Sequence, residues 1–85
     1  MKEFEFVIRD PLGLHARPAG ILSRTASDFT SKITLNYGTQ SVQLRRLIAV
    51  IALQAKQGER VRIQAEGEDE ESAIAQLHAV CQQSL

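Results

Sequence analysis

The sequence has little cysteine, no long apolar run and no net charge. Its single cysteine, Cys81, has no partner for an internal disulfide and cannot form a zinc cluster alone. The longest apolar stretch, residues 47–53, is far below the 18 or so residues that span a bilayer, so we expect no direct insertion into a membrane. The first six residues alternate charged and aromatic side chains and do not resemble a signal peptide. These absences favour a reducing, cytoplasmic location.

Ten basic residues balance ten acidic ones, and only four aromatic side chains are present. This balance argues against a nucleic-acid-binding protein, which needs a basic surface and often an aromatic platform for stacking bases. The charges are unevenly spread, since residues 1–56 hold eight Lys or Arg against four Asp or Glu. A positive front half suits an anionic ligand or an acidic partner, although ordinary scatter of charge explains it equally well.

Hydrophobic periodicity over the 85 residues predicts a single domain, 1–85, of class α+β. Alternating residues predict strands at Glu3–Arg9, Ile33–Tyr37, Gln40–Leu44 and Arg60–Glu66. Apolar residues at helical spacing predict helices at His15–Phe29 and from Asp69 past Cys81, with a short helix within Arg45–Ala55. Helices with one apolar face should cover one face of an antiparallel sheet, most simply in a split βαβ topology.

The most informative segment runs from Gly13 to Ala19. Gly13 permits a sharp turn and Pro18 suits the first turn of a helix, so we expect His15 at or next to the N-cap. The backbone N–H groups of Ala16 and Arg17 would then form an anion site at the positive end of the helix dipole. The same potential favours a neutral imidazole, which is a good nucleophile for phosphorus.

Arg17 offers a permanent positive charge and a planar fork that matches phosphate oxygens. The chain has no Walker loop, no apparent Ser/His/Asp set and no histidine at metal-ligand spacing, which favours a phosphoryl carrier over a complete enzyme. A structural alternative stays open, in which His15 only caps a helix and Arg17 is a solvated charge. His78 is interpreted as a surface residue, and Cys81 as a buried apolar one.

The segment Gly13–Ala19 resembles the phosphorylation-site motif of the HPr family, the histidine-containing phosphocarriers of the bacterial phosphoenolpyruvate-dependent sugar phosphotransferase system. The turn at Lys56–Gly58 and the junction at Ala65–Glu70 are also similar, so the resemblance covers essentially the whole chain. It implies that Nδ1 of His15 accepts a phosphoryl group from phosphorylated enzyme I and passes it to enzyme II A domains, without a cofactor or metal. It also implies an HPr-like open-faced β-sandwich, with strand order 1-4-2-3 and three helices on one face.

The resemblance further implies that partners dock on the first two helices, and we expect a monomer that presents one surface to donor and acceptor in turn. Positive charge from Arg24, and also from Arg45 and Arg46, would suit acidic partners. The expected docking residues are Gly20, Arg24, Leu47, Ile48 and Ile51.

The chain departs from the family pattern in the second helix. Arg46 stands where many Gram-positive relatives carry a regulatory serine, and Ser41 is not an equivalent, so we predict no phosphorylation by HPr kinase/phosphorylase. Residues Ile48–Leu53 also replace the Met- and Gly-containing segment of relatives, which puts partner choice in doubt. Two alternatives are an HPr-like paralogue that feeds a dedicated enzyme or regulator, and a small α+β binding module in which His15 is only a cap.

Overall fold

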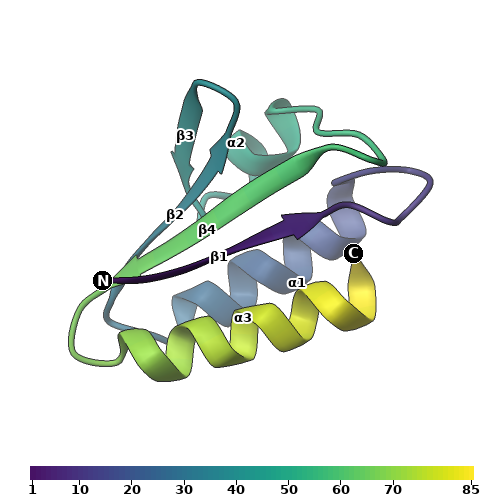
Figure 1. Cartoon of the computed structure of the whole chain (residues 1–85). Helices are drawn as coiled ribbons and strands as arrows, with labels where there is room; N and C mark the ends of the chain where they lie inside the picture. Colours follow the sequence, from purple (N-terminus) through teal and green to yellow (C-terminus); the bar gives the residue numbers. More distant parts are fainter.

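The computed structural model describes residues 1–85 and contains four strands and three helices (Figure 1). Their order, β-α-β-β-α-β-α, is the one predicted from the sequence. The elements are β1 (Lys2–Val7), α1 (Ala16–Ser27), β2 (Lys32–Tyr37), β3 (Gln40–Gln43), α2 (Leu47–Ala52), β4 (Arg60–Glu66) and α3 (Glu70–Ser84).

The strands form one sheet in the order β1-β4-β2-β3, and every neighbouring pair is antiparallel. Helices α1 and α3 contact each other and lie side by side on one face of this sheet, while α2 contacts α1 and β3 (Figure 1). The other face of the sheet carries no helix. The predicted fold class, strand order and two-layer arrangement are confirmed.

The core follows from the alternation of each strand and the apolar stripe of each helix. In β4, Val61, Ile63 and Ala65 are buried, whereas Arg60 and Arg62 are exposed on the opposite face. Each helix meets this surface with its own apolar side chains, which from α1 and α3 include Ala19, Leu22, Ala26, Ala73, Leu77 and Cys81.

Cys81 is fully buried, as predicted, and burial raises the pKa of its thiol to about 12. None of the three helices has the length and apolar character needed to cross a bilayer.

Three predictions of local structure were wrong. Helix α1 ends at Ser27 rather than Phe29. The first strand ends at Val7 rather than Arg9, because the N–H groups of Arg9 and Asp10 both donate to the carbonyl of Leu85 at the end of α3. His78 is half-buried rather than a free surface residue, because its ring packs edge-on against Phe4 with the ring centroids 4.8 Å apart.

Candidate functional site

A tight turn before α1 places His15 at the helix start. Gly13 has a φ of +71°, and a Cβ at this position would lie 2.4 Å from the carbonyl oxygen of Ala55, so only glycine fits. The N–H of Leu14 donates to the same carbonyl at 2.9 Å. His15 is the N-cap residue of α1, with extended backbone angles, as predicted.

The first turn of α1 is open. The N–H groups of Ala16 and Arg17 donate to no other group of the protein, Pro18 has no N–H, and no acidic residue occupies this turn. The side chain of His15 makes no capping hydrogen bond and is about 30% exposed, so it does not satisfy these amides itself. The N-terminal end of α1 therefore keeps its free donors and its positive potential for an anion beside the imidazole.

Sequence reasoning missed Asp10, whose carboxylate lies beside the ring. Nε2 of His15 is 3.2 Å from Oδ2 of Asp10, while Oδ1 of the same carboxylate accepts the N–H of Leu12 at 2.8 Å. The hydrogen bonds from Leu12 and then from His15 lower the pKa of Asp10, which keeps this carboxyl ionised. The composition of residues 10–13, Asp-Pro-Leu-Gly, is typical of a turn. Nothing in it signalled contact with a side chain five residues on.

Arg17 and Asp10 both line a hollow of about 260 Å³ between the start of α1 and the end of α3. The side chain of Arg17 is exposed, and its charge contributes to the lowered pKa of Asp10. His15 itself does not line this hollow. Its walls are formed by Asp10, Arg17, Pro18, Ile21, Gln83 and Ser84.

The expected docking residues divide into exposed and buried ones. Ile48 is 76% exposed and Leu47 is 36% exposed, and both line a largely apolar hollow of about 470 Å³ with Arg46, Ala49 and Ala52. Arg24 is also exposed.

Gly20 and Ile51 are less exposed than the other three expected docking residues. Gly20 is buried, and a Cβ there would lie 3.6 Å from Nη1 of Arg24, so the arginine lies over this position. Ile51 is half-buried and packs against the core. Direct docking by these two residues stays a prediction, with Arg24, Leu47 and Ile48 the more accessible of the five.

Comparisons with known proteins identify the family of this chain. A family model described as the PTS HPr component phosphorylation site matches residues 2–83. The phosphocarrier protein HPr of Mycoplasma capricolum is 40% identical over 74 residues, which cover 87% of this chain and 83% of that protein.

Solved structures are similar over nearly the whole chain. The crystal structure of HPr-C-His from Thermoanaerobacter tengcongensis is 37% identical with a TM-score of 0.92, covering 98% of this chain and 93% of that one. An HPr dimer from the same organism, also 37% identical, has a TM-score of 0.77 and covers 98% and 95% of the two chains. On its fold, its sequence and the family match, this chain belongs to the HPr family of phosphocarrier proteins of the phosphotransferase system.

Proposed function

We propose that this chain carries a phosphoryl group on Nδ1 of His15, accepting it from phosphorylated enzyme I and passing it to the A domains of enzyme II during sugar uptake. The observation that carries the proposal is the open, acid-free first turn of α1, with a partly exposed imidazole and an exposed arginine beside it. Membership of the HPr family supports the choice of reaction, and a carrier that meets enzyme I and enzyme II A domains in the cytoplasm is part of this proposal.

In the transfer step, the lone pair of Nδ1 forms a bond to phosphorus, and the bond from phosphorus to the donor atom of enzyme I breaks with its electron pair. The reverse exchange delivers the group to the A domain. The guanidinium of Arg17 and the N–H groups of Ala16 and Arg17 bind the phosphoryl oxygens. The chain supplies a nucleophile and an anion site but no second reactant, so it acts as a carrier rather than a complete enzyme.

Partners would dock beside α2 and α1. The exposed apolar side chains of Leu47 and Ile48 line one hollow with Arg46, and the exposed Arg24 lies in α1, which contacts α2. This surface suits a partner with an apolar patch and an acidic rim. A carrier that uses one surface in turn for donor and acceptor is expected to act as a monomer, although a dimeric HPr structure exists. Gel filtration at working concentration tests this.

Regulation by a seryl phosphate is not expected. Arg46 occupies the N-cap of α2, and Ser41 lies in β3, where its hydroxyl donates to the side chain of Asn36. Incubation with HPr kinase/phosphorylase and ATP should leave no phosphoserine detectable by mass spectrometry. A stoichiometric phosphoserine would overturn this part of the proposal.

The central test is phosphoryl transfer from phosphoenolpyruvate through enzyme I, followed by phosphorus NMR for an acid-labile phosphohistidine. The parent and a His78→Gln variant should both be phosphorylated, whereas His15→Ala should not. His78 is a matched control because it is the only other histidine of the chain. Label on His78, or none on the parent with an active control carrier, would contradict the assignment and favour a binding module.

A further inference from the structure

We propose that Asp10 is a positioning residue for His15, whose carboxylate holds the ring proton on Nε2 and so leaves Nδ1 with a free lone pair. The predicted effect on phosphoryl transfer rests on the proposed function, whereas the predicted effect on the tautomer of His15 does not. It follows from the contact between Oδ2 of Asp10 and Nε2 of His15 at 3.2 Å.

A neutral imidazole has two ring nitrogens, of which one carries the proton and the other the lone pair. The hydrogen bond made by one nitrogen decides which tautomer is present. An ionised carboxylate only accepts hydrogen bonds, so Asp10 pairs with an Nε2–H donor and excludes the tautomer in which Nε2 is the acceptor. The nucleophilic lone pair is then confined to Nδ1, the atom that the family resemblance makes the acceptor.

The carboxylate is itself fixed in place. The carbonyl of Leu85 accepts the N–H groups of Arg9 at 2.7 Å and Asp10 at 2.8 Å, and the carbonyl of Asp10 accepts the N–H of Gly13 at 2.8 Å. Oδ1 is held by the N–H of Leu12 at 2.8 Å, so Oδ2 is the oxygen that faces the ring. A carboxylate fixed by backbone and side-chain contacts orients the imidazole in the way that outer-shell partners orient metal-bound histidines.

The same contact matters after transfer. When Nδ1 becomes bonded to phosphorus and Nε2 keeps its proton, the ring carries positive charge that Asp10 stabilises from the side opposite the phosphoryl group. No proton has to move during the exchange. The carboxylate touches neither the phosphorus nor its oxygens, and acts only through the imidazole.

Asp10→Asn tests the proposal sharply, because the Leu12 N–H still requires an oxygen acceptor and turns the new NH2 group toward His15. That NH2 would donate to Nε2 and move the ring proton to Nδ1. Asp10→Ser keeps an acceptor for Leu12 but is too short to reach the ring. Asp28→Asn is the matched control, since it removes the same charge at the far end of α1.

The first readout is the tautomer of His15 in the free protein, from its ring nitrogen-15 shifts where the ring is neutral. The parent and Asp28→Asn should show the Nε2–H form, Asp10→Asn mainly the Nδ1–H form, and Asp10→Ser a mixture. An unchanged Nε2–H form in folded Asp10→Asn and Asp10→Ser would overturn the proposal. Nitrogen-15 correlation spectra establish folding of each variant.

The second readout is the rate of phosphorylation by enzyme I, which should fall roughly 10–100-fold in Asp10→Asn and less in Asp10→Ser. Equal rates in all variants would overturn the positioning role. If the parent is not phosphorylated at all while the tautomer changes as expected, the proposed function fails and the control of the ring by Asp10 stands. The two failures are therefore distinguishable.

Discussion

Helices α1 and α3 run antiparallel along the sheet, so their N-terminal ends lie at opposite ends of the molecule (Figure 1). The two ends carry the same partial positive charge from the helix dipole but very different side chains. The first turn of α3 contains Glu70 and Glu71 after the N-cap Asp69, whereas the first turn of α1 contains no acid. One helix carries acids in its own first turn, and the first turn of the other has none.

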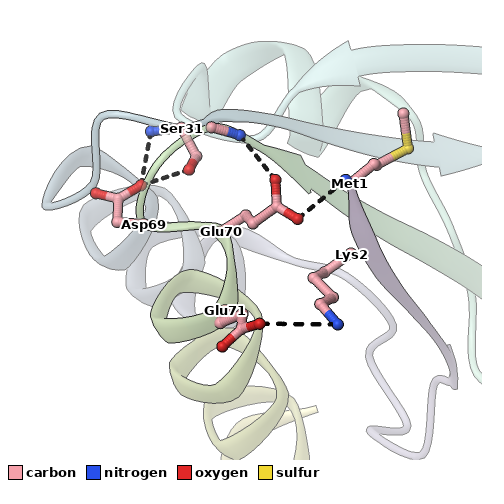
Figure 2. A network of polar contacts seen from close by, with 7 residues as sticks. Met1, Lys2, Ser31, Asp69, Glu70 and Glu71 are labelled. Carbon is pink, nitrogen blue, oxygen red and sulfur yellow. Dashed lines mark hydrogen bonds and ion pairs between the residues drawn. The ribbon is translucent and has the colours of Figure 1, made fainter.

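The acidic end is occupied by bonds within the chain. Asp69 accepts the backbone N–H of Ser31 at 2.9 Å and also the hydroxyl of Ser31 (Figure 2). It accepts the backbone N–H of Thr30 at 2.8 Å as well. Glu70 pairs with the N-terminal amine of Met1 at 2.9 Å and accepts the N–H of Gly67 at 3.1 Å. These bonds join α3 to the loop before β2 and to the start of β1.

The positive N-terminal end of a helix contributes to stability in α3 and to ligand binding in α1. A helix start whose acids hold neighbouring strands and loops has little positive potential left for a ligand. A start with free amides, an arginine and a histidine retains that potential for an exogenous anion. An acid added to the start of α1 should therefore slow phosphoryl transfer, whereas loss of an acid from the start of α3 should lower stability.

The largest effect is expected when the open end is given an acid. Ala16→Glu places a carboxylate in the first turn of α1, where it repels the incoming phosphoryl group and competes for the free amides. Transfer from enzyme I should fall on the order of 100-fold, while the free energy of unfolding stays within about 1 kcal/mol of the parent. Ala16→Gln, of the same size without the charge, is the control. Equal rates in the two variants would show that charge at this end does not govern transfer.

Removing the cation from the same end should have the next largest effect. Arg17→Gln loses charge-assisted hydrogen bonds to the phosphoryl oxygens, and transfer should slow roughly 10–100-fold. Arg17→Lys keeps the charge without the planar fork and should fall between the parent and the glutamine variant. Because Arg17 is exposed, urea denaturation should give equal stabilities. A lysine variant as slow as the glutamine variant would assign the effect to geometry alone.

At the acidic end, the same kind of change should affect stability and leave transfer unchanged. Hydrogen bonds from Ser31 and Thr30 lower the pKa of Asp69 from 3.8 to about 2. Since the pKa is lower in the folded state, the stabilisation is complete above pH 4 and is lost as the pH falls toward 2.

Asp69→Asn should therefore melt several degrees below the parent at pH 7. Its NH2 group is a hydrogen-bond donor and would face a donor group of Thr30 or Ser31 that now donates to the Asp69 carboxylate. The gap should close as the pH approaches 2. Thermal melts between pH 2 and pH 7 measure this, with phosphoryl transfer assayed at pH 7. A gap that persists unchanged at pH 2 would rule out the ionised carboxylate as its source.

The contacts that sequence reasoning found are local, and those it missed join distant segments. The strand alternation and the Gly13–Ala19 motif are readable because they depend on neighbouring residues, and the HPr resemblance supplied the strand order. The Asp69–Ser31 bonds join residues 38 apart. The Asp10–His15 contact spans five residues, but it depends on a loop held by Leu85 and Ala55, which no local pattern encodes. His78 was misplaced for the same reason, since its partner Phe4 lies in β1.

The smallest effect is expected from the outermost charge pair of the acidic end. Nζ of Lys2 lies 3.9 Å from Oε1 of Glu71, and both side chains are more than half exposed (Figure 2). Water and salt screen such a pair, so Glu71→Gln should change the free energy of unfolding by less than about 0.5 kcal/mol. Urea denaturation at low and high salt measures this, with exposed Glu68→Gln as the control. A larger loss in Glu71→Gln that survives high salt would show that the acidic end acts as one coupled network, rather than through Asp69 and Glu70 alone.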